Sequence, residues 1–234
     1  MKNWRERIVV GVTTTANRRP QEHWKEQLRE IKALGIKKIA LFPTTLLFKE
    51  RKELYQELEK SGVEEVKLLH LRGDFKTEEL EYFWKRFKTR WFNCHEHELK
   101  IFYDKFPKFR KNILLELTPW PDLAVKIEPN RLGGFCLDLA HVQMLQEREH
   151  RKKVDYIISR LKNTPVHANH LNGYSFEFKK DQHFVSRKEQ LNYLTKLPEK
   201  MFGEVLALEM ENSIKSQLKY KEYIVKLFSR RFGA

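Results

Sequence analysis

Residues 7–45, RIVVGVTTTANRRPQEHWKEQLREIKALGIKKIALFPTT, hold a strand pattern, a helix pattern and a second strand pattern. The two outer segments, 7–15 and 37–45, are short, apolar and bounded by polar residues, which predicts strands. The middle segment, 20–35, begins with a proline, ends with a glycine and repeats apolar residues three or four apart, which predicts a helix. This unit therefore indicates two parallel strands joined by a helical crossover.

The same alternation continues along the chain. Six further strands are predicted at residues 65–74, 90–98, 112–120, 133–141, 164–172 and 203–212, with helical spacing in 55–62, 77–88 and 151–163. Eight strands, each followed by a helical pattern, predict an α/β fold: one (β/α)8 TIM barrel over residues 1–234. An open doubly wound sheet is less consistent with the sequence, because no glycine-rich phosphate turn is present. Eight units in 234 residues also predict short loops.

The net charge and the cysteine content indicate which binding partners and which cellular compartment to expect. Lys and Arg number 46 against 32 Asp and Glu, a net charge of +14. This excess favours nucleic acid or an anionic membrane surface, although basic proteins that bind neither also exist. Cys94 and Cys136 form no C-x-x-C pair, so we expect a reducing cytoplasm. No apolar run approaches ~18 residues and the N-terminal residues are charged, so neither a membrane span nor a signal peptide is expected.

Potential metal ligands recur at the predicted strand ends, which in such a barrel meet at one mouth. They are His70, His95, Glu116, Asp138, His141, His170 and Glu209, and the loop after the seventh strand adds Asp181 and His183. Residues two apart share a strand face, so His97 and Glu211 remain alternatives to His95 and Glu209. By the same parity, His167 is predicted to point away from His170, toward the helices.

A single rim histidine or carboxylate is more often a hydrogen-bonded polar residue than a ligand. Nine converging ionisable groups differ, because they would repel one another or stay unpaired unless cations held them. Imidazoles and carboxylates without thiolates favour zinc or manganese over magnesium or calcium. The sequence therefore predicts a site for more than one metal ion.

These residues, in this order, resemble the endonuclease IV family of xylose isomerase-like TIM barrels. The resemblance rests on His70, N-x-H at 93–95, Glu116, G-x-C-L-D-x-x-H at 134–141, H-L-N at 170–172, D-x-H at 181–183 and Glu209. It covers strands three to eight and, more loosely, the second. The chain departs from the family pattern at Gly173-Tyr174 and near Val12.

The resemblance implies a hydrolase with two or three zinc ions, or manganese in their place. One ion would be held by His70, His95 and Glu116; a second by Glu116, Asp138, His170 and Glu209; a third by His141, Asp181 and His183. Glu116, Glu209 and His170 would be the catalytic residues. In this family, a hydroxide generated at the metal site cleaves DNA on the 5′ side of an abasic site. We expect a cytoplasmic monomer acting in DNA repair.

Basic and aromatic side chains near the predicted rim are candidates for substrate binding. They are Arg18, Arg19, Arg72, Trp120, Tyr174, Lys179 and Lys180. Cations of this kind contact phosphates, and aromatic rings stack on bases or fill the gap left by a missing one. Arg51, after the second strand, belongs to the same basic set. The alternative is that these residues are ordinary solvated helix starts and packed aromatics.

Two other functions remain open. A sugar or sugar-phosphate isomerase or epimerase of the same superfamily would bind one ion on Glu116, Asp138, His170 and Glu209, with a phosphorylated sugar as partner. It would have no use for His141, Asp181 and His183. A non-catalytic barrel that binds a partner through its basic face would tolerate the loss of ligands, whereas here the set is complete.

Overall fold

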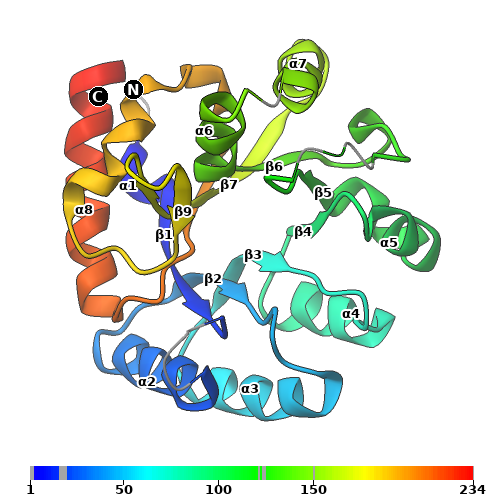
Figure 1. The fold of residues 1–234 in the computed structure, drawn as a ribbon. Coiled ribbons are helices and arrows are strands. Elements are labelled where there is room, and N and C mark those ends of the chain that lie inside the picture. Colours follow the sequence, from blue (N-terminus) through cyan, green and yellow to red (C-terminus); the bar gives the residue numbers. More distant parts are fainter. Residues whose placement is uncertain (1–2, 16–19, 121, 123–124, 150, 234) are drawn as a thin grey trace.

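The computed structural model describes residues 3–15, 20–120, 122, 125–149 and 151–233. Eight parallel strands form a closed barrel in the order β1-β10-β7-β6-β5-β4-β3-β2, surrounded by helices (Figure 1). The barrel strands are β1 (Ile8–Thr13), β2 (Lys38–Phe42), β3 (Glu65–His70), β4 (Trp91–His95), β5 (Ile113–Glu116), β6 (Gly134–Asp138), β7 (Val166–Leu171) and β10 (Val205–Leu208). All eight predicted strands are present, and the predicted (β/α)8 barrel is confirmed.

Eight α-helices lie in the described part of the chain. They are α1 (Trp4–Arg7), α2 (Pro20–Ala33), α3 (Phe48–Lys60), α4 (Thr77–Arg86), α5 (Leu99–Lys105), α6 (Leu139–Glu147), α7 (Arg151–Arg160) and α8 (Ile214–Phe232). Four short 3₁₀ helices complete the set: η1 (Pro107–Asn112), η2 (Pro129–Arg131), η3 (Lys188–Lys196) and η4 (Glu199–Met201). No described helix is long and apolar enough to cross a membrane.

The prediction that every strand is followed by a helix is wrong at two places. Between β5 and β6, the described residues form only η2, and between β7 and β10 they form a hairpin and two 3₁₀ helices. The hairpin pairs β8 (Gly173–Ser175) with β9 (Lys180–Gln182) in antiparallel register. The loop after β7 is therefore long and structured, contrary to the expectation of short loops throughout.

Apolar residues fill the barrel interior below the layer formed by the C-terminal ends of the strands. The interior cluster consists of Val9, Ala40, Phe42, Leu68, Leu114, Cys136, Ala168, Val205 and Ala207, all buried. Side chains two residues apart on a strand face the same way. The next inward position on β3, β5, β6 and β7, and the one just past β10, carries a histidine or a carboxylate, so polar side chains form the layer above this cluster.

His167 does not point toward the helices as its parity predicts. Its ring stacks on Trp91 of β4, with centroids 4.0 Å apart, and its Nδ1 lies 3.2 Å from Glu204 Oε1. The register between β6 and β7 shifts by one residue next to this position, because Phe135 pairs with Val166 whereas Cys136 pairs with Ala168. The irregularity breaks the period of two, so parity cannot be counted from His170 back to His167.

Arg51 is a structural residue and not part of an exposed basic rim. Its side chain is fully buried, and it donates to both carboxylate oxygens of Glu79 at 2.8 and 3.0 Å and to Asp74 at 2.9 Å. This ion pair joins α3 to α4 at the outer layer. Its charge is therefore compensated within the fold.

Candidate metal centre

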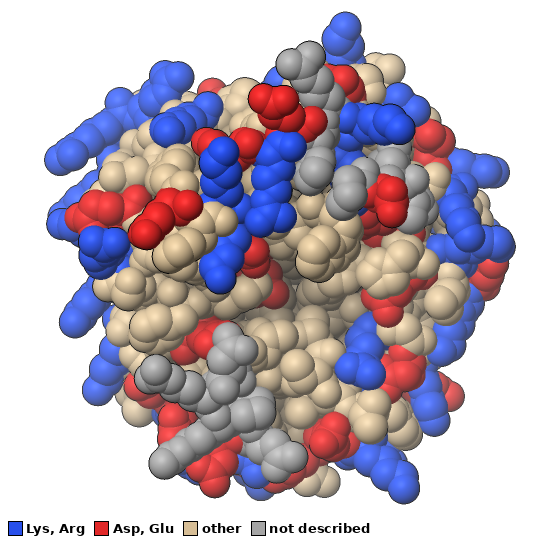
Figure 2. All heavy atoms as spheres, in the orientation of Figure 1, with Lys and Arg blue, Asp and Glu red and all other residues tan. Residues whose placement is uncertain are grey.

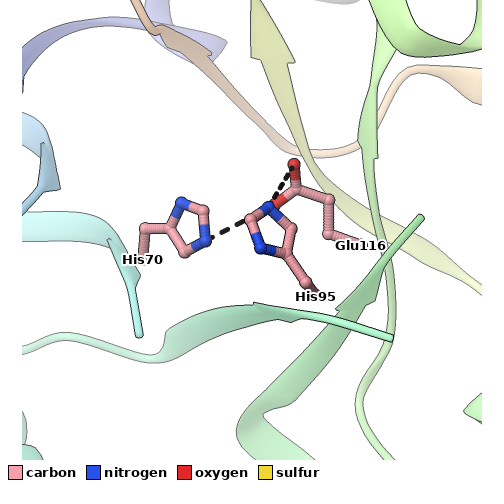
Figure 3. A group of neighbouring side chains, drawn as sticks. All are labelled: His70, His95 and Glu116. Carbon is pink, nitrogen blue, oxygen red and sulfur yellow. Dashed lines mark ion pairs between the residues drawn. The ribbon is translucent and has the colours of Figure 1, made fainter. Parts of the chain in front are cut away.

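The C-terminal ends of β3, β4 and β5 bring three side chains together. His70 ends β3, His95 ends β4 and Glu116 ends β5, and both imidazoles approach the carboxylate (Figure 3). His70 Nε2 lies 3.8 Å from Glu116 Oε2, and His95 Nε2 lies 3.6 Å from Oε1. Asn93, two residues before His95, donates to Glu116 Oε2 at 2.7 Å and so fixes the carboxylate. These ligands are held by strands, and the carboxylate has an orienting partner.

Glu116 also lies next to residues from the other side of the barrel. Its Oε1 is 3.4 Å from His170 Nδ1 and 4.0 Å from His141 Nδ1. His170 Nδ1 is in turn 3.1 Å from Glu209 Oε2. Glu116 and His170 are almost completely buried, and Glu209 directly follows β10. Glu116 is therefore the central carboxylate of the cluster.

His141 lies in the first turn of α6 and not at the end of a strand as predicted. The strand ends at Asp138, whose Oδ1 accepts a hydrogen bond from the His141 amide at 2.9 Å and so caps the helix. An N-cap aspartate satisfies one of the unpaired amides of the first turn, which is why the strand stops there. The cap leaves Asp138 Oδ2 free to approach His141 Nε2, at 3.6 Å, and to accept from Asn172 at 3.1 Å.

The hairpin after β7 completes the cluster. Asp181 lies on β9 and His183 follows it, and Asp181 Oδ2 lies 3.3 Å from His183 Nε2 and 3.9 Å from His141 Nε2. His183 Nδ1 lies 3.3 Å from the carbonyl oxygen of Glu209. All nine predicted ligands are thus linked through contacts of 4.0 Å or less.

Several subsets of these side chains are compact enough to hold one ion. Ligand atoms lie within 4.8 Å of one another in His70–His95–Glu116, in His70–His170–Glu209 and in Glu116–Asp138–His141. The first subset agrees with the partition that the resemblance implies, and the other two distribute the remaining ligands differently. A further subset, His95–His97–Glu98, meets the same criterion at the rim. Glu209, and not Glu211, belongs to these subsets.

The protonation states reflect burial and close charges. Burial lowers the pKa of His70 to about 3, so this imidazole is neutral at pH 7. Burial opposes the charging of His95 and His183, but Glu116 beside His95 and Glu209 with Asp181 beside His183 raise their pKa values to about 9 and about 10. In the absence of a metal cation, the positive charge of protonated imidazoles offsets the negative charge of the carboxylates.

Several buried nitrogen atoms in the cluster have no hydrogen-bond partner among the described residues. They are His70 Nδ1, His141 Nδ1 and both ring nitrogens of His170, of which Nδ1 faces the Glu209 and Glu116 carboxylates at 3.1 and 3.4 Å without forming a hydrogen bond. An unpaired buried polar atom costs roughly 1–3 kcal/mol, so such atoms call for a partner that the protein itself does not supply. Imidazole nitrogens and carboxylate oxygens at these separations are the ligands that zinc and manganese take. The residues fit a divalent metal centre.

Metal affinity is expected to rise steeply with pH. His95 and His183 have pKa values of about 9 and about 10, so both carry protons at pH 7 that a metal ion must displace. Each ion that displaces one of these protons should have an apparent association constant that grows by about one log unit per pH unit between pH 6 and 8. Competition with a chromophoric chelator at several pH values measures this slope. An affinity independent of pH would show that neither histidine is a ligand.

A cavity of about 470 Å³ opens over the cluster. The molecular face in Figure 2 is hollowed at its centre, with acidic side chains at the hollow's edge and Lys and Arg over much of the surrounding surface. Besides five of the ligands on the strands and α6, the lining includes Asp181, His183, Trp120, Met144, Arg148 and Lys180. Two predicted substrate-binding residues, Trp120 and Lys180, thus lie at the mouth, and the Trp120 side chain is 65% exposed.

The other predicted substrate-binding residues do not line this cavity. Tyr174 is 1% exposed and packs against Tyr193 and Phe176, so it belongs to the core beneath the hairpin. Arg72 donates to Asp74 Oδ1 at 3.0 Å and to the Thr44 carbonyl at 2.8 Å, which holds its side chain beside these residues and away from the cavity. Lys179 is exposed at the hairpin turn. Arg18 and Arg19 lie outside the described residues.

Sequence reasoning missed several residues around the site. Asn172 donates a hydrogen bond to Asp138 Oδ2 and so orients this ligand. Its amide side chain, two residues after the ligand His170 in the H-L-N motif, is the sequence signal that could have identified it. Lys153 of α7 is fully buried and pairs with Glu96, which accepts from the Thr118 amide at 2.8 Å and from its hydroxyl at 2.9 Å. This buried pair ties together the loops after β4 and β5. Nothing in the local sequence pattern distinguishes Lys153 from the other lysines of the chain. Its role follows only from its position next to Glu96 in the folded structure.

Comparisons of the chain with protein-family models, with curated proteins and with solved structures give no match. The fold and the ligand geometry therefore carry the functional argument.

Proposed function

We propose that this protein is a metal-dependent phosphodiester hydrolase. The observation that supports it is the continuous set of nine histidines and carboxylates at the barrel mouth, linked by contacts of 4.0 Å or less. The set exceeds what one ion needs, since structural and catalytic zinc sites use three or four protein ligands. Phosphoryl chemistry benefits from more than one cation, because both the attacking and the leaving oxygen carry charge.

The ligand set would hold two or three divalent ions, of which zinc fits best and manganese is the alternative. Bound ions supply charge neutralisation for a phosphate group and lower the pKa of a water nucleophile. Glu116 and Glu209 contribute fixed negative charge: nearby imidazoles lower the pKa of Glu116 far below its usual value despite burial, and hold that of Glu209 at about 2. Carboxylates this acidic serve as ligands at neutral pH and not as proton acceptors. Asn93 keeps the Glu116 carboxylate in place.

A sugar or sugar-phosphate isomerase is the second candidate. His170 Nδ1 lies 3.4 Å from Glu116 and 3.1 Å from Glu209, two of the residues that would share the isomerase's single ion with it, and the cavity of about 470 Å³ has the size of typical small-molecule sites. The position of Asp181 and His183 favours the hydrolase, because the hairpin brings two extra ligands toward His141, where an isomerase needs none.

The first test is cleavage of DNA. With zinc or manganese supplied, we expect the protein to nick duplex DNA on the 5′ side of an abasic site. Binding should weaken with salt by about 0.9 log units per log unit for each phosphate neutralised. An abasic oligonucleotide assay beside a panel of aldose and ketose phosphates measures both activities. Turnover of any sugar without DNA cleavage would overturn the hydrolase in favour of the isomerase.

A further inference from the structure

One wall of the cavity is a single face of α6. His141, Met144 and Arg148 all line the cavity, and their spacing of three and four residues places them on one side of the helix. His141 belongs to the ligand cluster at the start of the helix, and Arg148 lies just past its end. Seven residues at 1.5 Å each separate the two by about 10 Å. The Arg148 backbone therefore lies about two helical turns from that of His141.

Lys180 of β9 lines the same cavity, one residue before Asp181. Arg148 and Lys180 are the only Lys or Arg side chains lining the cavity in the described part of the chain. Neither forms a salt bridge with another described residue, whereas Arg51 and Arg72 each pair with a carboxylate of the fold. Two exposed cations without an internal counterion thus face a cavity whose floor is acidic.

Trp120 lies on the same cavity, in the loop that follows β5. Its indole is 65% exposed, although an indole of this size is usually mostly buried. An exposed aromatic face beside cations is the arrangement on which single-stranded nucleic acids stack their bases. Lys180 also lies near the exposed ring of Phe178, at 5.8 Å from its centroid. The outer cavity therefore combines anion-binding and stacking groups.

We propose that Arg148 and Lys180 form a subsite for a second phosphate, adjacent to the phosphate at the ligand cluster, and that Trp120 stacks on a base between or beside them. This inference rests on the proposed hydrolase. Arg148 and Lys180 are cations outside the set of metal ligands, so they offer charge-assisted hydrogen bonds to a phosphate other than the one that the ligand cluster would hold. The substrate is accordingly a nucleic-acid strand with a phosphate beyond the scissile one. A sugar bisphosphate is the other source of the same chemistry.

The experiment compares two substrates across matched variants. Arg148→Gln and Lys180→Gln remove one cation each, and Lys152→Gln, at an exposed lysine on α7 outside the cavity, is the control. The substrates are bis(p-nitrophenyl) phosphate, with a single phosphate, and a short abasic oligonucleotide. Each cavity variant should lose roughly 10- to 100-fold in kcat/KM on the oligonucleotide, the loss expected for one charged hydrogen bond. The loss on the single-phosphate substrate should be at least tenfold smaller.

Equal losses on both substrates, or no loss on either, would overturn the subsite. If wild-type protein hydrolyses neither substrate, the proposed function fails. Binding then tests the subsite alone, by fluorescence anisotropy of the labelled oligonucleotide with the zinc-loaded protein. Weaker oligonucleotide binding by both cavity variants supports the subsite in that case. Dependence of hexose bisphosphate binding on Arg148 and Lys180, with unaltered oligonucleotide binding, would assign the second phosphate to a sugar and overturn the nucleic-acid substrate.

Discussion

Replacing Glu116 by Gln is expected to lower hydrolytic activity by roughly 10³-fold or more, because removal of a residue that merely orients a ligand already costs 10- to 100-fold. Glu116 is within 4.0 Å of His70, His95, His141 and His170, so it is the ligand shared by most of the cluster. Its amide counterpart has the same shape but neither the charge nor the second acceptor oxygen. Bound zinc, counted by elemental analysis, should fall together with activity.

The barrel should remain folded in Glu116→Gln. The histidines around the carboxylate can lose their protons when the charge is removed, so no uncompensated cation stays buried. Burial lowers the pKa of His95, but Glu116 raises it to about 9. This pKa should therefore fall in the variant, and NMR titration of the metal-free protein measures the change. Glu204→Gln makes the same chemical change at the opposite end of the barrel, beside His167, and should retain activity. Full activity of Glu116→Gln would remove Glu116 from the site.

The strands and inner ligands could be predicted because both follow one periodicity. On β5, β6 and β7 the apolar interior residues Leu114, Cys136 and Ala168 lie two positions before Glu116, Asp138 and His170. A period of two along short apolar strands thus identified the layer above the core. The same argument failed for His167, because an extra residue in the strand is invisible to a pattern that assumes regular register.

Helix starts were less visible in the sequence. The first turn of α3 is closed by Glu50, whose side chain accepts from the Leu47 amide at 2.7 Å, while the N-cap itself is a leucine. Without a Ser, Thr, Asp or Asn at this position, no cap signal marks the start. At α6 a cap signal exists in Asp138, but the apolar residues Leu139 and Ala140 also continue the strand pattern. Arg148 became recognisable as a cavity residue only once the start of α6 had fixed which face carries His141.

Charge in the sequence does not reveal where a cation is compensated. Arg51 and Lys153 look like ordinary members of a basic surface, yet both side chains are fully buried and paired with carboxylates distant in sequence. Tyr174 likewise follows the H-L-N motif in a position that favours substrate contact, but the hairpin turns its ring into the core. Such outcomes depend on contacts between distant segments, which local pattern does not encode.

Lys153→Met is expected to destabilise the protein by about 3–5 kcal/mol, the cost of leaving one member of a buried ion pair without its partner. Lys153 Nζ pairs with Glu96 and also donates to the Thr118 carbonyl at 2.9 Å, and its side chain is fully buried. Methionine fills much of the same volume, so the loss should come from the uncompensated Glu96 carboxylate and not from a cavity. Urea unfolding measures the free energy difference.

The double variant Lys153→Met/Glu96→Gln provides the control, because it removes both charges and keeps an acceptor oxygen for the Thr118 amide. Replacing a whole buried pair by neutral groups is often close to neutral, so the double variant should recover most of the lost stability. Glu96 directly follows His95, and Thr118 lies two residues after Glu116, so Lys153→Met should also weaken zinc binding as the two loops loosen. A single variant within about 1 kcal/mol of wild type would mean that Glu96 reaches water or takes up a proton once Lys153 is gone, and that the pair does not hold the loops after β4 and β5 in place.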